Sequence, residues 1–148
     1  MSLRDGVFRV VTGLHRAVFR VSRGRLLGRA GGMPVVILTT VGHRSGRKRR
    51  TILTAPLVEA DRVVLVASYG GHSHNPRWYQ NLLVHPEVGL TVAGKRERPM
   101  RARVAGRDER TDLWPRIVNA YPGYARYQER TDRRIPLVVL EPYAGRSE

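Results

Sequence analysis

The stretch that decides the fold reads VVILTTVGHRSGRKRR and covers residues 35–50. Its apolar, β-branched start predicts a strand, and Gly42 and Gly46 then allow a tight turn. Five cationic side chains crowd into and after this turn: Arg44, Arg47, Lys48, Arg49 and Arg50. Free N–H groups in a glycine turn favour an anion, and arginine side chains bind phosphate or carboxylate oxygens in pairs. The stretch therefore predicts a hairpin, with a second strand resuming at Thr51, that holds a multiply charged anion.

The whole chain shares this positive charge. Its 148 residues include 27 Lys and Arg against 12 Asp and Glu, a formal net charge of +15. Such an excess attracts nucleic acid, anionic lipid or a phosphate-rich cofactor. The lack of cysteine excludes disulfides and cysteine nucleophiles, and the histidines have no familiar zinc spacing, so we expect no metal site. The chain has no membrane-spanning run or signal-peptide pattern, so we expect a cytoplasmic protein.

Most of the chain after Pro34 has the composition of short strands. Segments rich in Val, Ile and Thr predict strands at residues 35–41, 51–58, 62–68, 88–92, 97–104 and 136–140. Two helices are expected, at residues 107–121 and at residues 75–84, where Asn75 would cap the helix and Pro76 would take its first position. Short antiparallel strands with few helices are typical of a small barrel. We therefore expect a mainly β, α+β domain at residues 33–143, with a tail at residues 144–148.

The first 32 residues are predicted to form a separate unit. Apolar side chains follow helical spacing at Val7, Val10, Leu14, Val18 and Val21, and arginines occupy much of the remaining surface. We expect an amphipathic helix at residues 5–27, followed by a glycine hinge. Such a helix can lie on an anionic membrane surface, cover a substrate as a lid, or pack on the core, and its pattern does not choose among the three.

Two further clusters combine glycine or proline with aromatic side chains. The first runs from Ser68-Tyr69-Gly70-Gly71 to Asn75-Pro76-x-Trp78-Tyr79-x-Asn81, in which Trp78 and Asn81 share a helix face. An indole can cover a flat ring and an amide can bond its edge; alternatively, Trp78 is core and Asn81 a helix-end residue. The second, Tyr121-Pro122-x-Tyr124-x-x-Tyr127, places three phenols along one side of a helical turn, where they either face a substrate or only pack.

Together these motifs resemble the deazaflavin-dependent nitroreductase family of actinobacterial F420-dependent oxidoreductases. The match keeps one order and spacing over residues 34–142. Besides the two aromatic clusters, it includes Leu38-Thr39-Thr40-x-Gly42-x-Arg44-Ser45-Gly46-x-x-Arg49, Val66-Ala67-Ser68-x-Gly70-Gly71 and Thr131-Asp132-Arg133-x-Ile135-Pro136-x-Val138-Val139. The resemblance implies a split β-barrel that binds coenzyme F420, a two-electron hydride carrier with a phospholactyl-polyglutamate tail.

The resemblance also implies roles for individual residues. The phosphate and carboxylates of the tail would be held by Arg44, Ser45, Gly46, Lys48 and Arg49. The deazaflavin ring would be held by Ser68, Tyr69, Gly70, Asn75, Pro76, Trp78 and Asn81. An electron-poor, apolar acceptor such as a quinone, enone or nitroaromatic would be faced by the catalytic tyrosines, Tyr121, Tyr124 and Tyr127. The coenzyme would carry the chemistry, and the protein would orient it and exclude water.

The chain departs from the family pattern where Arg50-Thr51-Ile52 replaces a frequent Asn-Pro, Thr54 a strand tyrosine, and Tyr69 a lysine. An FMN-binding split barrel is the alternative enzyme, although one phosphate would not call for so many cations. A nucleic-acid-binding barrel is the alternative outside enzymes, but the aromatics do not alternate with arginines along strands. We prefer a quinone as acceptor because a membrane-dissolved substrate suits the N-terminal helix, which would place the protein at the inner face of the cell membrane.

Overall fold

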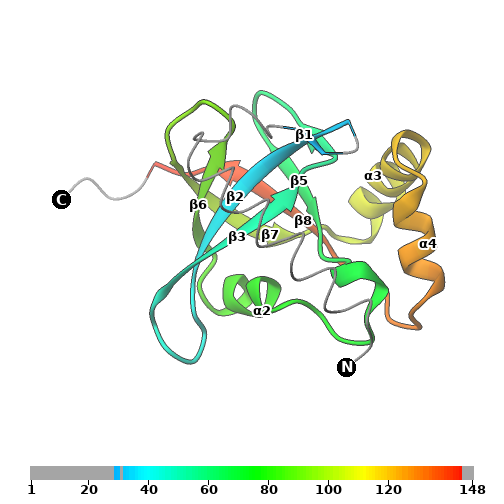
Figure 1. The fold of residues 1–148 in the computed structure, drawn as a ribbon, viewed down its shortest axis with the longest axis horizontal. Helices are drawn as coiled ribbons and strands as arrows, with labels where there is room; N and C mark the ends of the chain where they lie inside the picture. The colour runs from blue at the N-terminus through cyan, green and yellow to red at the C-terminus, as the bar shows by residue number, and fades with distance from the viewer. Residues whose placement is uncertain (1–28, 31, 145–148) are drawn as a thin grey trace.

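The computed structural model describes residues 29–30 and 32–144, which form an antiparallel sheet with helices at its margins (Figure 1). Eight strands follow in the order β1-β2-β6-β7-β8-β5-β4, and β3 pairs with β2 off this path. The strands are β1 (Arg29–Ala30), β2 (Met33–Val41), β3 (Lys48–Thr54), β4 (Leu57–Val58), β5 (Val63–Val66), β6 (Glu87–Val92), β7 (Arg98–Val104) and β8 (Leu137–Pro142). The helices are η1 (Tyr69–Gly71), α2 (Arg77–Val84), α3 (Arg107–Ala120) and α4 (Gly123–Glu129). The predicted mainly β, split-barrel fold is confirmed.

The β2–β3 hairpin is longer than predicted, and the strand after it is shorter. Val41 pairs with Lys48, so β3 begins at Lys48 and not at Thr51. The predicted single strand at residues 51–58 is wrong because Pro56 has no N–H with which to continue the ladder. The chain leaves β2 at this point, and β4 pairs with β5 instead. The basic residues after the turn therefore lie on a strand and not in a loop.

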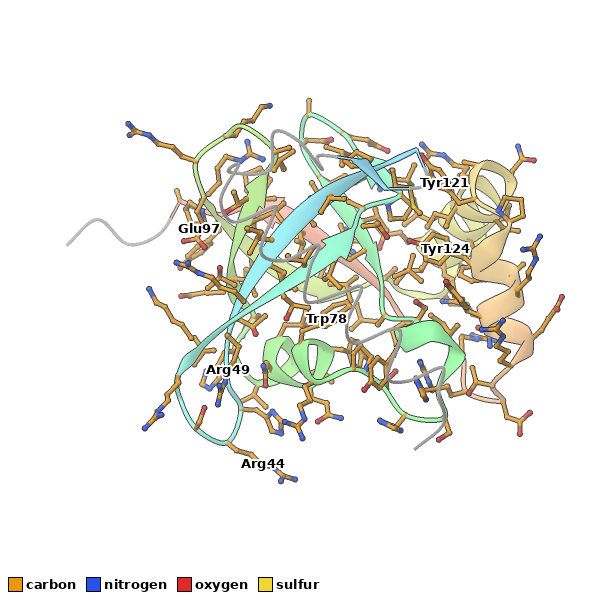
Figure 2. The ribbon with its side chains drawn as sticks, in the orientation of Figure 1. Arg44, Arg49, Trp78, Glu97, Tyr121 and Tyr124 are labelled. Carbon is orange, nitrogen blue, oxygen red and sulfur yellow. The ribbon has the colours of Figure 1, made fainter. Side chains whose placement is uncertain are left out.

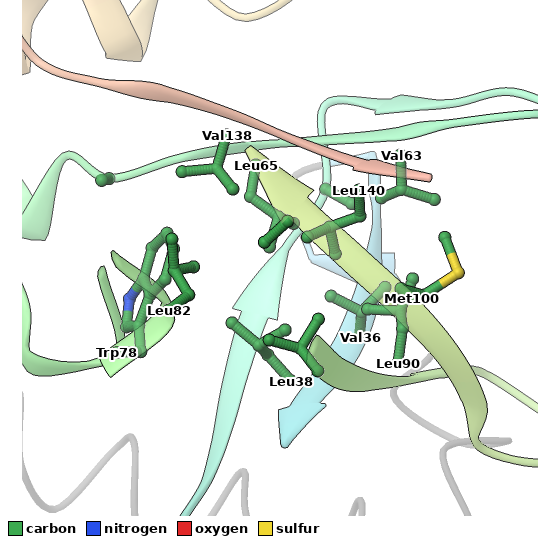
Figure 3. Packing of buried hydrophobic residues seen from close by; sticks show 14 residues of the cluster. Val36, Leu38, Val63, Leu65, Trp78, Leu82, Leu90, Met100, Val138 and Leu140 are labelled. Carbon is green, nitrogen blue, oxygen red and sulfur yellow. The ribbon is translucent and has the colours of Figure 1, made fainter. Parts of the chain in front are cut away.

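Packing on both faces explains why β5 and β8 read as continuous apolar runs. One face carries Leu65 and Val138 into a cluster with Trp78 of α2 (Figure 3). The opposite face carries Val64 and Val139 into a second cluster beneath α3 and α4. A strand buried on both faces has no reason to alternate apolar and polar residues. These two strands thus form the centre of the domain, and the helices cover it from two directions.

Helix α2 begins two residues later than predicted. It spans Arg77–Val84, with Pro76 in the N-cap position and no side-chain hydrogen bond to its first turn. Asn75 is not the cap, because its Oδ1 accepts a hydrogen bond from Arg133 Nη1 at 2.7 Å. A partner 58 residues away has displaced the local capping interaction that the sequence pattern favours.

The three tyrosines do not share one helical turn, which corrects a second prediction. Helix α3 ends at Ala120, close to its predicted end, and Tyr121 is its C-cap. A new helix, α4, begins at Gly123 and carries Tyr124 and Tyr127. Tyr121 therefore approaches the cluster from a different segment, and its hydroxyl donates to the Gly32 carbonyl at 3.5 Å.

The predicted N-terminal helix lies outside the described residues, and the division of the chain at residue 32 stays a prediction. Within the predicted hinge, the short strand β1 pairs Arg29 with Pro34 and Ala30 with Met33. Gly32 turns the chain with φ 81°, a left-handed conformation that suits glycine. Across residues 29–30 and 32–144, none of the helices has the length and hydropathy needed to cross a membrane.

Candidate active site

The turn between β2 and β3 is closed by its own backbone. The Gly42 N–H donates to the Arg47 carbonyl at 2.8 Å, and the Gly46 N–H donates to the Gly42 carbonyl at 2.9 Å. The Ser45 Oγ accepts from the Arg47 N–H at 3.2 Å, and a Cβ on Gly42 would lie 2.5 Å from that oxygen. The Gly46 N–H, predicted to hold the anionic tail, is therefore already engaged inside the turn. The Ser45 hydroxyl hydrogen is still available to a ligand.

Four cations at this turn have no acidic partner among the described residues. The residues concerned are exposed, and none forms an ion pair with another described residue: Arg44, Arg47, Lys48 and Arg49. Lys48 and Arg49 are fixed on β3 opposite Val41 and Thr40, whereas Arg44 and Arg47 belong to the turn. Adjacent like charges repel one another, so a polyanion bound here would relieve the repulsion and gain several charge-assisted hydrogen bonds.

Asn81 attaches this hairpin to helix α2. Its Oδ1 accepts from the His43 backbone N–H at 3.0 Å and lies 2.6 Å from the His43 Nδ1, while its Nδ2 donates to Thr40 Oγ1 at 3.1 Å. An amide oxygen only accepts, so this pairing requires the His43 proton on Nδ1. The predicted sharing of a helix face by Trp78 and Asn81 is confirmed, because both are buried, at 6% and 5% exposure. Asn81 thus spends most of its hydrogen-bonding capacity within the protein, and Trp78 packs in the core.

The turn after β5 has an unusual backbone. Tyr69 has φ 44°, and Gly70 and Gly71 follow with φ 63° and 81°, so three consecutive residues are left-handed. The Gly71 N–H returns to the Ser68 carbonyl at 2.9 Å, whereas the Tyr69 and Gly70 N–H groups have no acceptor among the described residues. Ser68 is right-handed at this point, and successive N–H groups in such a right-handed to left-handed turn form a concavity that attracts electronegative atoms. This geometry suits the predicted contact between the Tyr69–Gly70 backbone and a ligand.

The predicted catalytic tyrosines differ in how their hydroxyls are used. Tyr124 is 6% exposed, and its Oη lies 3.1 Å from Thr54 Oγ1 and 3.4 Å from Met33 Sδ. Burial raises the pKa of Tyr124, so this phenol stays neutral in neutral solution. Tyr127 is half-buried, packs edge-on against Tyr124 with ring centroids 6.1 Å apart, and makes no hydroxyl hydrogen bond among the described residues. The Tyr127 hydroxyl is therefore the one free to meet a substrate.

Strand β3 connects the cations to the tyrosines. Thr54, which contacts Tyr124, lies six positions along the strand from Lys48, so the two side chains point to the same face, about 20 Å apart at ~3.3 Å per residue. Figure 2 shows Arg44 and Arg49 toward one end of the hairpin, Tyr121 and Tyr124 toward the other, and Trp78 between them. One end of β3 is therefore cationic and the other end lies beside the tyrosines, an order of residues that suits an elongated ligand with one anionic end.

Two features escaped the sequence-based prediction. Arg133 belongs to a matched motif, but its role as a hydrogen-bond donor to the segment at residues 67–75 could not be read from that motif. A groove of about 550 Å³ lies between α3, α4 and the loop before β8, and it shares no residue with the predicted site. The described residues contain no group of three His, Cys, Asp or Glu side chains arranged to hold a metal ion.

The fold defines the class of protein: a split barrel, here with an exposed cationic hairpin between β2 and β3. A family model described as F420H(2)-dependent quinone reductase matches residues 11–142. The F420H(2)-dependent quinone reductase Rv1261c of Mycobacterium tuberculosis (strain ATCC 25618 / H37Rv) is 38% identical over 131 residues, which cover 86% of this chain and 87% of the relative.

Solved structures agree with this result. A structure described as an F420-H2 dependent reductase (FDR-A) is 39% identical, with a TM-score of 0.65 over 73% of this chain and 94% of that chain. Another, described as a domain-swapped dimer, is 32% identical, with a TM-score of 0.65 over 94% of this chain and 96% of that chain. The chain belongs to the F420H(2)-dependent quinone reductase family. It is an F420-dependent oxidoreductase, which confirms the predicted cofactor and reaction class.

Proposed function

We propose that this protein binds reduced F420 along β3 and passes its hydride to a quinone. The observation that carries the proposal is the path of about 20 Å along one face of this strand, from Lys48, which forms no ion pair with another described residue, to Thr54 beside the tyrosines. A coenzyme with a flat ring and a long anionic tail suits such a path. The name of the mycobacterial relative, a quinone reductase, supports the choice of acceptor.

The residues present fit this coenzyme. Arg44, Lys48 and Arg49 are exposed and unpaired among the described residues, so they would bind the tail phosphate and carboxylates, with the Ser45 hydroxyl as an additional donor. The open N–H groups of the turn at residues 68–70 would donate to polar atoms of the ring. When bound, reduced F420 supplies the hydride. Trp78 and Asn81 would support the ring site through core packing and through the hairpin attachment.

The acceptor side is assigned to Tyr127, with Tyr124 behind it. A quinone that accepts a hydride also needs one proton to become the hydroquinone, and a neutral phenol near it can hold or donate that proton. The free Tyr127 hydroxyl suits this role, whereas the Tyr124 hydroxyl is occupied by Thr54 and Met33. Tyr121, at the end of α3, packs against the same buried cluster as Tyr127.

A fluorescence titration with F420 and FMN tests the proposal. We expect micromolar or tighter binding of F420, and Arg49→Ala should weaken it by about 1.5–3 kcal/mol, the scale of a charge-assisted hydrogen bond. Arg98→Ala is the matched control, because Arg98 is also exposed on a strand but lies on β7. Equal or tighter binding of FMN would overturn the assignment, as would an equal effect of both substitutions.

We also propose a cytoplasmic location, with the N-terminal segment resting on anionic lipid. The support is the amphipathic, arginine-rich pattern of residues 5–27 and an acceptor that dissolves in membranes. Co-sedimentation with anionic vesicles, for the full chain and for a variant starting at Gly32, tests this. Binding that weakens with salt and disappears on truncation is expected; if both chains stay in the supernatant at low salt, the membrane role is wrong.

A further inference from the structure

The side chain of Arg133 spans the whole segment between β5 and α2. Its Nε donates to the His72 carbonyl at 2.8 Å, and its Nη2 donates to the Ser68 carbonyl at 2.7 Å. Its Nη1 donates to the Ala67 carbonyl at 3.2 Å and to Asn75 Oδ1 at 2.7 Å. One guanidinium therefore fixes both ends and the middle of residues 67–75.

This segment needs external support. Tyr69 is left-handed, a conformation that carries a steric penalty for any side chain with a Cβ, and it is exposed at 47%. Its ring packs against His72 and His74, with ring centroids 4.6 Å and 5.4 Å apart, but both belong to the same segment and do not tie it to the rest of the protein. Strained backbone persists only where surrounding contacts determine it. The four hydrogen bonds from Arg133 supply most of these contacts, and Arg130 Nη1 adds a longer one to the Gly70 carbonyl at 3.5 Å.

The same turn rests against the helix that carries the tyrosines. A Cβ on Gly71 would lie 2.6 Å from the Tyr127 carbonyl and 2.9 Å from Arg130 Cβ, so the two backbones are in close contact. Arg133 itself follows α4 in the chain. The turn with the open N–H groups and the segment with Tyr127 are thus joined by this contact, by the Arg133 side chain and by a 3.5 Å hydrogen bond from Arg130 Nη1 to the Gly70 carbonyl.

The hydrogen bonds of Arg133 fix geometry and leave its charge uncompensated. All four acceptors are neutral oxygens, and Arg133 forms no ion pair with any other described residue. Burial lowers the pKa of Arg133, yet a guanidinium remains charged in neutral solution. Lysine keeps the charge but has a single nitrogen and no planar set of donors, so it cannot reach the same four acceptors.

We propose that Arg133 is a positioning residue for hydride transfer, holding the turn at residues 68–71 in register with Tyr127. The inference rests on the proposed function, in which this turn receives the deazaflavin ring and Tyr127 faces the acceptor. The tail-binding hairpin is a separate element. Loss of Arg133 therefore disturbs the alignment of donor and acceptor more than it disturbs the capture of the coenzyme.

The test compares Arg133→Lys with Arg134→Lys in the full chain. Arg134 is the matched control because it is the next residue, is exposed, and makes no hydrogen bond to residues 67–75. We expect Arg133→Lys to speed amide hydrogen exchange by about tenfold or more at Gly71 and His72, whose N–H groups are hydrogen-bonded within residues 67–75, while exchange in β5 and β8 stays slow. It should lower kcat at least about tenfold with KM for reduced F420 within about threefold, because misplaced reactants lose rate steeply. Arg134→Lys should change none of these quantities.

Each outcome decides the matter. Wild-type exchange or wild-type kcat in Arg133→Lys overturns the proposal, as does a rise in KM that accounts for the whole loss of activity. Loss of exchange protection throughout the sheet in Arg133→Lys would mean that this variant is unfolded, and Asn75→Ala, which removes one of the four acceptors, then replaces it in the test. Asn75→Ala must show faster exchange confined to residues 67–75 and a lower kcat; otherwise the proposal is wrong. If the wild-type chain fails to oxidise reduced F420, the proposed function fails, while the exchange data still decide whether Arg133 holds the turn.

Discussion

Replacing Asn81 by alanine should destabilise the protein before any cofactor is added. The Asn81 amide is the hydrogen-bonded link between α2 and the cationic hairpin, through Thr40 and two groups of His43. If that link is its main role, its removal is a folding defect. If the amide is instead reserved for the edge of the ring, the cofactor-free protein should tolerate the change.

The expected loss follows from the burial of the three partners. Thr40 is 1% exposed, so its hydroxyl would be left without a partner away from water, which costs about 1–3 kcal/mol. His43 is half-buried, so water can replace part of the hydrogen bonding that its backbone N–H and ring lose with Asn81. We therefore expect the free energy of unfolding to fall by about 2–4 kcal/mol, a large part of the 5–15 kcal/mol that is usual for a domain.

Urea denaturation of the cofactor-free protein measures this loss. Gln80→Ala is the matched control on the same helix, because its amide makes a single 3.5 Å hydrogen bond to the Asn75 carbonyl and should cost less than about 1 kcal/mol. Combining Asn81→Ala with Thr40→Val should show a coupling energy of about 1 kcal/mol. A loss below about 0.5 kcal/mol for Asn81→Ala, together with weakened F420 binding, would refute the reasoning and favour direct contact with the ring.

Three further predictions concern the catalytic cluster, the core and the pH dependence. Tyr127→Phe should lower kcat by about tenfold or more, and Tyr124→Phe by much less; equal effects in steady-state assays contradict the assigned roles. Leu65→Ala should lower the free energy of unfolding by about 2–5 kcal/mol in urea denaturation, whereas exposed Leu83→Ala should stay near wild type. Hydrogen bonds from Arg103 lower the pKa of Glu109 from its ordinary value of 4.5. The stability that this ion pair adds is therefore present above pH 4.5 and is lost as the pH falls through the lowered pKa of Glu109. Glu109→Gln should therefore cost about 1 kcal/mol in urea denaturation at pH 7, and its difference from wild type should vanish in acid; a constant difference contradicts the ion-pair explanation.

Local sequence patterns predicted the parts of the fold that local chemistry decides. The short stretches Glu59-Ala60-Asp61 and Ala93-Gly94-Lys95 predict hairpin turns between neighbouring strands. Both turns are present, and Gly94 has the positive φ that its turn requires. The strand predicted across Pro56 was wrong because partner choice is non-local. An apolar run continues through this proline, but the two halves pair with different strands. Periodicity reports burial and cannot identify the neighbouring strand.

At the candidate site, too, the residue types could be predicted from the sequence, but their hydrogen-bond partners could not. The family resemblance implied that the Gly/Ser/Arg turn, the Ser68 turn and the tyrosines belong to one site, and this assignment stays a prediction. The sequence did not show that Asn81 binds groups 38 and 41 residues away, or that Arg133 reaches back 65 residues to Ser68. Such contacts exist only after the sheet has assembled. A contact of this kind also explains why Asn75 does not cap α2, because its side-chain oxygen accepts a hydrogen bond from Arg133 instead.

Both long-range ties use neutral hydrogen-bonding groups, and they leave Arg44, Arg47, Lys48 and Arg49 without an ion pair among the described residues. Asn81 positions the hairpin with an amide, and Arg133 bonds carbonyl and amide oxygens, so neither brings a carboxylate to the site. Adjacent uncompensated charges repel and weaken the cofactor-free fold. An anionic coenzyme removes that repulsion when it binds, and a ligand that binds only the folded state stabilises it by mass action. The same residues that would give the protein its affinity for F420 should therefore also make its stability depend on F420.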